Sequence, residues 1–291
     1  MSGALPGPPA EAVRRAVALA LAEDLGALGD LTAALVPAGA LARGALVARA
    51  AGVLAGRACA EEAFAAVDRS VVTRWGLDDG AELGAGTVLA EVEGPLRSVL
   101  TAERTALNFL CHLSGIATLT RRFADAAAAG DPRCRVLDTR KTTPGLRALE
   151  KAAVRAGGGA NHRGSLSEAV LVKDNHLAGT SIAGAVARAR ALWPGRTVEV
   201  ECDRLEQVHE ALAAGTSIVM LDNMGPEEVA ACVAVVRGVD PERRAVLVEV
   251  SGGVTLETAP AFAAAGADLV SVGALTHSAP ALDIGLDLEE G

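Results

Sequence analysis

The chain of 291 residues lacks the features that mark several large protein classes. It contains no Tyr, only four Phe and two Trp, and its five Cys form no Cys-x-x-Cys pair. Closely spaced cysteines are typical of disulfide-rich secreted domains and of zinc sites, so we exclude both and expect a reducing compartment. With so few aromatic residues, Ala, Val and Leu must fill the core, which favours closely packed layers of helices on strands.

Long apolar runs and an excess of basic residues are also missing. The segment RRAVALALA is similar to a signal peptide, but two acidic residues follow it directly. Val13, Val17, Leu21 and Leu25 recur at helical spacing, so we interpret this segment as an amphipathic helix. No run reaches the length of a membrane span. A net charge of −9 and a pI near 5.1 argue against nucleic-acid binding. We therefore expect a soluble, cytoplasmic protein that binds neither nucleic acid nor membrane.

Lysine is the scarcest charged residue, and its few copies are concentrated in one segment. The chain has only Lys141, Lys151 and Lys173, and all of them lie within residues 133–173. This segment holds nine Lys or Arg against three acidic residues. Such a local excess of cations in an acidic protein predicts a pocket for a small anion, and the lysines add compact ammonium groups to the guanidinium forks of arginine.

From residue 133 onward, short β-rich segments alternate with Ala-rich helical segments. We predict strands at 135–139, 169–173, 197–201, 217–221, 245–250 and 267–272. We predict the intervening helices at 144–157, 181–193, 205–214, 226–237 and 255–265. This alternation is typical of βαβ units around a parallel sheet. About six strands are fewer than the eight of a full barrel, so an incomplete barrel and an open sheet both remain, and polar residues after every strand favour the barrel.

The first part of the chain does not follow this alternation. Strand patterns lie within residues 41–56 and 86–96, and helical patterns cover 58–67 and about 98–129. We therefore expect a separate α+β unit here, with domains at residues 1–114 and 115–291.

Cationic side chains lie at the ends of predicted strands, where barrels and open α/β sheets bind ligands, or in the Gly-rich loop at 157–164. They are Arg140, Lys141, Arg163 and Lys173, with His162 beside them. Arginine forks bind carboxylates and lysine supplies a point charge, so this set suits a ligand with several anionic groups. By contrast, three cations at helical spacing are interpreted as solvated charges on a helix surface: Arg147, Lys151 and Arg155.

Acidic residues and glycines complete this set of strand ends. Glu201 and Asp222 could hold Mg²⁺ together with substrate phosphates, could face a positive charge on a sugar ring, or could cap the next helices. Glycines allow a phosphate to approach the backbone at a helix start. The candidate phosphate site comprises Ser251, Gly252, Gly253, Gly273 and Ala274.

Several motifs together resemble the quinolinate phosphoribosyltransferase (decarboxylating) family. They are DTRKTTPGLR at 138–147, GGGANHRG at 157–164, LVKDNHL at 171–177, VEVE at 198–201, LDNM at 221–224, VSGGVTLE at 250–257 and VGALTHS at 272–278. EDLGALGDLT at 23–32 and ERTALNFLCHLSGIAT at 103–118 extend the resemblance into the first domain. Ser165 and Glu168 depart from the family pattern, so we expect them to alter the loop after Arg163.

The resemblance implies an α/β fold with an N-terminal α/β sandwich domain and an incomplete parallel barrel. It also implies a homodimer in which Arg104 reaches quinolinate in the partner subunit, and the sequence leaves open whether dimers assemble into hexamers. The quinolinate pocket would be lined by Thr139, Arg140, His162, Arg163 and Lys173. Phosphoribosyl pyrophosphate would be held by Lys141 and the candidate phosphate site. Catalytic roles would fall to Lys141, Lys173, Glu201 and Asp222, the last two also serving Mg²⁺.

The implied reaction is phosphoribosyl transfer to quinolinate with loss of CO₂, giving nicotinate mononucleotide and pyrophosphate in NAD biosynthesis. Three alternatives remain open at this stage. They are a related phosphoribosyltransferase acting on nicotinate, an aldolase that forms a Schiff base on Lys173, and a non-catalytic protein that binds pyridine carboxylates.

Overall fold

The computed structural model of the chain describes residues 6–239 and 246–289, which form two compact units. The first unit contains the chain up to residue 121, residues 142–158 and the chain from residue 274 onward. The second contains residues 122–141 and 159–273. Two segments that are distant in sequence thus return to the first unit, which the sequence analysis did not foresee. The predicted boundary at residue 114 itself stays a prediction.

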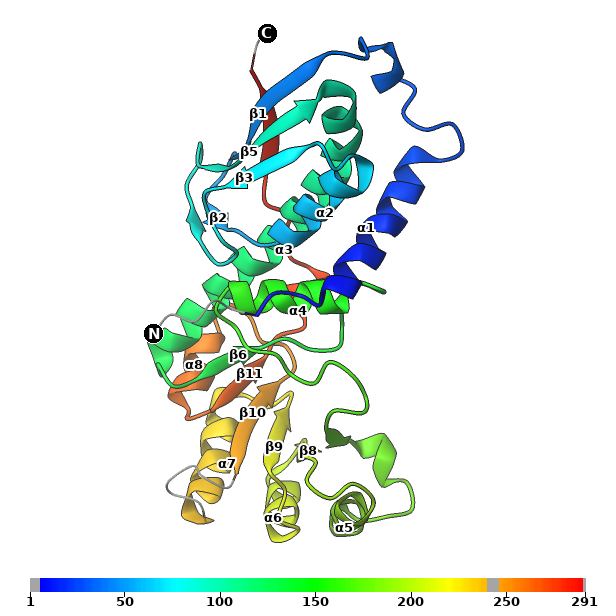
Figure 1. Ribbon diagram of the computed structural model, residues 1–291. Coiled ribbons are helices and arrows are strands. Elements are labelled where there is room, and N and C mark those ends of the chain that lie inside the picture. The colour runs from blue at the N-terminus through cyan, green and yellow to red at the C-terminus, as the bar shows by residue number, and fades with distance from the viewer. Residues whose placement is uncertain (1–5, 240–245, 290–291) are drawn as a thin grey trace. The chain divides into compact units, whose positions relative to one another are not determined.

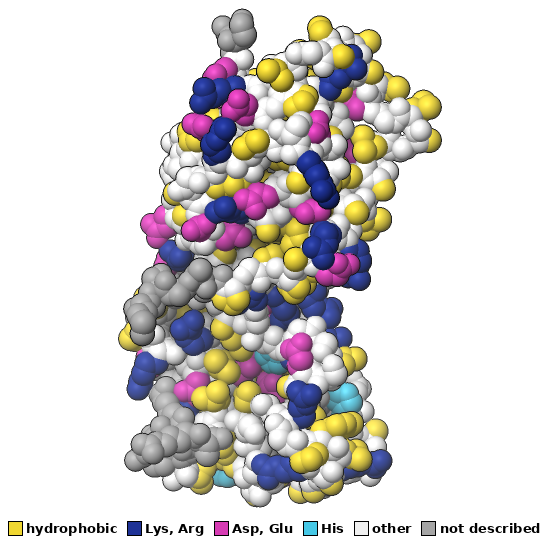
Figure 2. Space-filling model, viewed as in Figure 1, with side chains coloured by type: hydrophobic (Ala, Val, Ile, Leu, Met, Phe, Trp, Pro, Cys, Tyr) yellow, Lys and Arg dark blue, Asp and Glu magenta, His cyan; other side chains and the backbone are white. Residues whose placement is uncertain are grey.

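The first unit is built on a four-stranded sheet in the order β12-β1-β5-β3 (Figure 1). Its strands are β1 (Leu41–Ala48), β3 (Val72–Trp75), β5 (Val88–Pro95) and β12 (Ile284–Leu288), and all neighbours pair antiparallel. β2 (Gly52–Val53) and β4 (Glu82–Leu83) form a separate small pair. In Figure 2 acidic and basic side chains are interspersed over this unit, and Arg74 and Glu93 on paired strands form one such ion pair at 2.9 Å.

Within the described residues, the first unit contains the four predicted helices and two short ones that were not predicted, η1 (Ala33–Leu35) and α9 (Ala274–His277). The predicted helices are α1 (Ala10–Leu25), α2 (Arg57–Val67), the first part of α3 (Leu96–Gly130) and α4 (Arg147–Ala156). The expected face of α1 is confirmed, because Val13, Val17 and Leu21 are buried. This face packs against α2 (Figure 1).

The second unit contains a six-stranded parallel sheet in the order β6-β11-β10-β9-β8-β7 (Figure 1). The strands are β6 (Arg135–Leu137), β7 (Val170–Val172), β8 (Val198–Cys202), β9 (Ile218–Asp222), β10 (Leu247–Ser251) and β11 (Leu269–Ser271). The first strand of the unit pairs with the last, as in a barrel, whereas no ladder joins β6 to β7 within the described residues. The α/β fold with an incomplete barrel is therefore confirmed.

Helices connect successive strands and cover the outside of this sheet (Figure 1). They are η2 (Asp174–Leu177), α5 (Ile182–Leu192), α6 (Leu205–Ala213), α7 (Pro226–Val239) and α8 (Ala259–Ala264). The strands are nearly continuous apolar runs because both faces of a parallel sheet are covered. Val200, Val219 and Val248 are fully buried, so the predicted core of small aliphatic residues is confirmed. No helix in the described ranges combines the length and the apolar character that a membrane span requires.

Candidate active site

The carboxyl ends of the six parallel strands surround a pocket of about 510 Å³ that lies entirely within the second unit. The lining residues come from the strands, from the loops that follow them, and from the loop before β7 that carries His162 and Arg163. The predicted site residues that line the pocket are Thr139, Arg140, Lys141, His162, Arg163, Lys173, Glu201, Asp222, Ser251, Gly252 and Gly253. Leu171, Met220, Asn223 and Ser271 complete the lining. The structure therefore brings most of the predicted residues together.

Cations form one side of this pocket. Arg163 is partly buried, and its Nη1 donates a hydrogen bond to the carbonyl oxygen of Ala169 at 3.1 Å. Burial lowers the pKa of the Arg163 guanidinium, and the nearby positive charge of Arg140 lowers it further. Two arginines that repel each other in a partly dry pocket gain from an anionic ligand, which relieves that repulsion and supplies acceptors.

Acidic residues lie near the carboxyl ends of two neighbouring strands. Glu201 is the penultimate residue of β8 and forms an ion pair with Lys173, while Asp222 ends β9 and accepts a hydrogen bond from the Asn223 side chain at 2.7 Å. A Schiff-base lysine requires a dry site, but the Lys173 side chain is 40% exposed and already paired with a carboxylate. This geometry argues against a Schiff base on Lys173.

A glycine turn after β10 closes the floor of the pocket. Gly252 has a φ of 90°, and a Cβ at this position would collide with the side chain and backbone nitrogen of Asn223. Gly253 has a φ of 61°, yet a Cβ there would meet no atom within 4 Å. Only glycine thus suits position 252, and the backbone at 253 is accessible to a ligand.

The loop that carries His162 and Arg163 is fixed by a buried carboxylate. Asp138, directly after β6, is fully buried, and its Oδ1 accepts from the backbone N–H of His162 at 2.9 Å. Its Oδ2 accepts from the Asn161 side chain at 2.5 Å. Asp138, the first residue of the family motif at 138–147, therefore has a structural role, because its hydrogen bonds hold the loop that carries His162 and Arg163.

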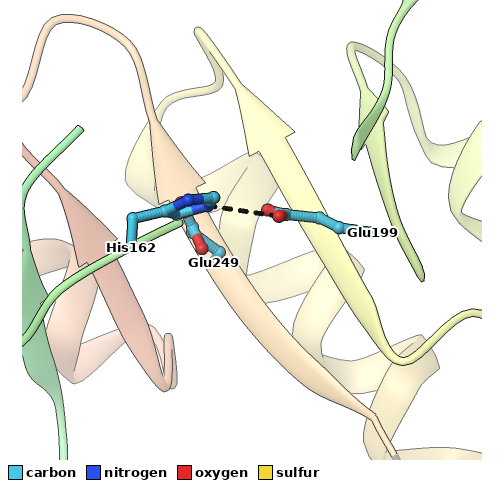
Figure 3. Close-up of side chains that lie close together, drawn as sticks. All are labelled: His162, Glu199 and Glu249. Atoms are coloured by element: carbon cyan, nitrogen blue, oxygen red, sulfur yellow. Dashed lines mark ion pairs between the residues drawn. The ribbon is translucent and has the colours of Figure 1, made fainter. Parts of the chain in front are cut away.

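The side chains of His162, Glu199 and Glu249 lie close together (Figure 3), where both glutamates are buried and His162 also lines the pocket. The His162 Nε2 atom is 3.1 Å from Glu199 Oε2 and 3.5 Å from Glu249 Oε1. Burial, and next the negative charge of Glu199, raises the pKa of Glu249 to about 8. Neither glutamate was predicted to belong to the site. Glu199 stands between Val198 and Val200, and Glu249 stands between Val248 and Val250, so each is a charged residue inside an apolar strand, which is unusual.

Other predicted residues lie outside this lining. Gly273 follows β11 in the same unit, whereas Arg104 and Ala274 belong to the first unit, so their roles stay predictions. The interpretation of the α4 cations as solvated charges was wrong for Lys151, which is only 6% exposed. Its helix packs against both α1 and α9, and this covers more of its surface than a one-sided amphipathic helix would.

The loop after Arg163 contains the two departures from the family pattern. Glu168 folds back, and its Oε2 accepts from the backbone N–H of Gly164 at 2.7 Å. Ser165 and Ser167 share a hydrogen bond between their hydroxyls at 2.9 Å. Ser165 and Glu168 thus both form hydrogen bonds within the loop after Arg163, the segment that we expected them to alter.

These features define a class of protein: an α/β barrel that binds a small anionic ligand at the carboxyl ends of its strands. Comparison with family models then identifies the particular group. The model "Quinolinate phosphoribosyl transferase, N-terminal domain" matches residues 30–114, and the model for the C-terminal domain matches residues 116–287. The chain therefore belongs to the quinolinate phosphoribosyltransferase family.

Individual relatives agree over nearly the full length of the chain. A nicotinate-nucleotide pyrophosphorylase [carboxylating] from Mycobacterium leprae is 45% identical, covering 96% of this chain and 98% of the relative. A probable enzyme of the same name from Bacillus subtilis is 42% identical, covering 91% and 90%. The solved nicotinate-nucleotide pyrophosphorylase from Francisella tularensis superposes with a TM-score of 0.91 at 37% identity, covering 99% of this chain and 100% of that chain.

Proposed function

We propose that this chain is a quinolinate phosphoribosyltransferase (decarboxylating) of NAD biosynthesis. The observation that carries the proposal is the pocket that brings Arg140, Arg163 and Lys173 together with a glycine turn and a pair of acidic residues. A pyridine dicarboxylate needs cations on one side, and a phosphorylated ribose needs accessible backbone N–H groups on the other. Family membership and relatives of this name support the same substrates.

Each side of the pocket then has a role in the first step. Arg140, Arg163 and Lys173 bind the carboxylates of quinolinate, with Thr139 and His162 in the same wall. Lys141 and the turn Ser251–Gly253, continued by Gly273 and Ala274, hold the phosphates of phosphoribosyl pyrophosphate. The ring nitrogen attacks the anomeric carbon, and the bond to pyrophosphate breaks with its electron pair. Glu201 and Asp222 stabilise the positive charge that develops on the ribose.

The second step uses the charge created by the first. The alkylated ring nitrogen is cationic, so it withdraws the electron pair left when the adjacent carboxylate departs as CO₂, and a proton then adds to that carbon. Lys141 or Lys173 stabilises the charge that develops during this loss. The protein contributes positioning and fixed charge, with no covalent intermediate.

A magnesium ion suits the acidic rim in this scheme. Glu201 and Asp222 offer carboxylate oxygens on neighbouring strand ends, and Mg²⁺ binds one or two carboxylates together with substrate phosphates. When bound, the ion would neutralise the charge that grows on the departing pyrophosphate. Glu201 would have to divide its oxygens between this ion and Lys173, whose ammonium it already contacts.

The proposed assembly is a cytoplasmic homodimer in which Arg104 of one subunit reaches the quinolinate site of the other. This arrangement comes from the family resemblance, and Arg104 on α3 is the residue at the matching motif position.

The decisive experiment mixes the purified protein with quinolinate, phosphoribosyl pyrophosphate and Mg²⁺, and follows nicotinate mononucleotide and CO₂ together. A parallel reaction contains nicotinate instead of quinolinate. We expect equal amounts of both products from quinolinate and none from nicotinate. Turnover of nicotinate alone would refute the dicarboxylate pocket, and binding without turnover in either reaction would favour a non-catalytic pyridine-carboxylate binding protein.

A further inference from the structure

A series of donors and acceptors runs from β11 to the loop that carries Arg163. The Ser271 hydroxyl donates to Glu249 Oε1 at 2.5 Å. At the other end, the backbone N–H of Arg163 donates to His162 Nδ1 at 2.7 Å. Between them, His162 Nε2 lies 3.1 Å from Glu199 Oε2 (Figure 3). Since Nδ1 accepts a hydrogen bond, the ring proton must be on Nε2, the nitrogen that lies nearest to Glu199.

Two carboxylate oxygens interrupt this series. Glu199 Oε1 and Glu249 Oε2 are buried, and neither has a hydrogen-bond donor among the described residues. The side chains of the two glutamates are within hydrogen-bonding reach of each other, so one proton between them would satisfy both oxygens at once. Without that proton, two buried carboxylates would repel each other with no compensation.

A metal ion is the other way to join these groups, because the imidazole and both carboxylates converge within 4.8 Å. A metal on Nε2 would move the ring proton to Nδ1. That proton would then face the backbone N–H of Arg163, which now donates to Nδ1 at 2.7 Å. The contact with Arg163 therefore favours a shared proton over a metal.

We propose that Glu199, Glu249 and Ser271 are positioning residues that act through His162 on Arg163. Glu249 carries a proton that it donates to Glu199, and Glu199 accepts from His162 Nε2–H. The imidazole is thereby fixed in the tautomer whose Nδ1 receives the Arg163 backbone, and the guanidinium is held at the pocket wall. The inference rests on the proposed function, in which Arg163 binds a carboxylate of quinolinate.

The tautomer can be tested directly, without measuring activity. A ¹⁵N spectrum of protein labelled at histidine, with His162 assigned from a His162→Gln variant, should show a protonated Nε2 and an unprotonated Nδ1. A proton on Nδ1, a proton on both nitrogens, or the shift of a metal-bound nitrogen would each overturn the proposal.

Kinetics of matched variants test the effect on Arg163. Glu249→Leu removes the donor to Glu199, and Glu199→Leu removes the acceptor for His162. Each variant should raise the KM for quinolinate about tenfold. The KM for phosphoribosyl pyrophosphate should change less than about twofold in both variants. Glu249→Gln keeps an acceptor for Ser271 and a donor for Glu199, so it should restore most of the quinolinate affinity. A quinolinate KM that is unchanged in both leucine variants would overturn the proposal, as would equal effects on both substrates.

A control separates this role from general stability. Asp268 is buried and directly precedes β11, at the amino end of the strands and away from the pocket. It accepts a hydrogen bond from the backbone N–H of Val248 at 2.8 Å. Asp268→Asn should lower stability without a selective change in the quinolinate KM. If the wild-type protein does not turn over quinolinate at all, the proposed function fails, and the histidine spectrum still decides the hydrogen-bonded arrangement.

Discussion

Arg163 shows how a single residue can be prepared for an anionic ligand before the ligand arrives. Its backbone is held by His162, its Nη1 by the carbonyl of Ala169, and its charge lies in a partly buried pocket beside Arg140. Fixing a long side chain in advance lowers the entropy cost of binding, and the repulsion between the two cations is relieved when an anion binds between them.

The first prediction concerns this guanidinium. Arg163→Ala should lower kcat/KM for quinolinate about a hundredfold, because a partly buried charge-assisted contact to a carboxylate is lost, and it should leave the circular dichroism spectrum unchanged. Arg133→Ala is the matched control in the same unit, since Arg133 pairs with Asp131 and its side chain is 69% exposed. The control should change activity less than about twofold. An active Arg163→Ala protein beside an inactive control would contradict the assignment.

The second prediction concerns Glu249. Its pKa in the folded protein is about 8, above the ordinary value of 4.5, so the folded state binds a proton that the unfolded chain has released. This contribution to stability is complete below pH 4.5 and is lost as the pH rises towards 8, at about 1.4 kcal/mol per pH unit.

Glu249→Gln cannot lose this proton, which makes it the reference for that titration. Urea unfolding between pH 5 and pH 9 should show the wild type losing stability relative to Glu249→Gln until about pH 8, after which the difference becomes constant. Parallel stability curves for the two proteins would mean that Glu249 is ionised in the fold.

At the scale of elements, the glycine turn after β10 combines a packing requirement with a binding surface. Gly252 lies against Asn223, which itself has a positive φ of 55° at the end of β9, so two neighbouring strand ends fit together only through a residue without a side chain. Gly253 faces the open side of the same turn. The two glycines are adjacent in sequence but differ in role: Gly252 allows close packing against Asn223, and Gly253 leaves the backbone accessible.

The third prediction separates these reasons. Gly252→Ala should lower the free energy of unfolding by roughly 1–3 kcal/mol, because it adds a collision to an unfavourable backbone conformation. Gly253→Ala should cost less stability, yet it should raise the KM for phosphoribosyl pyrophosphate because the new methyl group projects towards the proposed phosphate site. Thermal unfolding and substrate kinetics of the two variants measure both effects. Equal losses of stability would show that the collision with Asn223 is relieved by small shifts.

Much at the element scale could be predicted from the sequence alone. The six strands of the second unit were predicted because parallel strands buried on both faces are continuous apolar runs, and most site residues followed because polar groups collect after such strands. Glu199 and Glu249 could not be assigned in this way, since each lies inside a strand, and only the fold shows that His162 reaches them both. The start of the strand predicted at 245–250 lies partly outside the described residues, and β10 begins at Leu247.

At the scale of the whole molecule, distant segments of the chain contribute to one compact unit. β12 completes the first sheet beside β1, and α4 and α9 join the same unit. No local pattern predicts such a return, because strand pairing between residues 44 and 288 depends on the path of the intervening chain. The carboxyl-terminal strand was for this reason absent from the predicted elements, while the barrel strands, most of which pair with the next strand along the chain, were predicted.

The last prediction addresses the proposed dimer, in which we expect Arg104 of one subunit to complete the pocket of the other. Arg104→Ala and Lys173→Ala should each be inactive alone, since the first lacks the contributed guanidinium and the second lacks a pocket cation. In a mixed dimer, the barrel of the Arg104→Ala subunit keeps Lys173 and receives an intact Arg104 from its partner. Half of randomly mixed dimers are mixed, and each has one complete site out of two, so co-refolding equal amounts should restore about a quarter of wild-type activity. If Arg104 instead served the barrel of its own chain, every site in every dimer would lack one of the two cations, and the mixture would remain as inactive as its components.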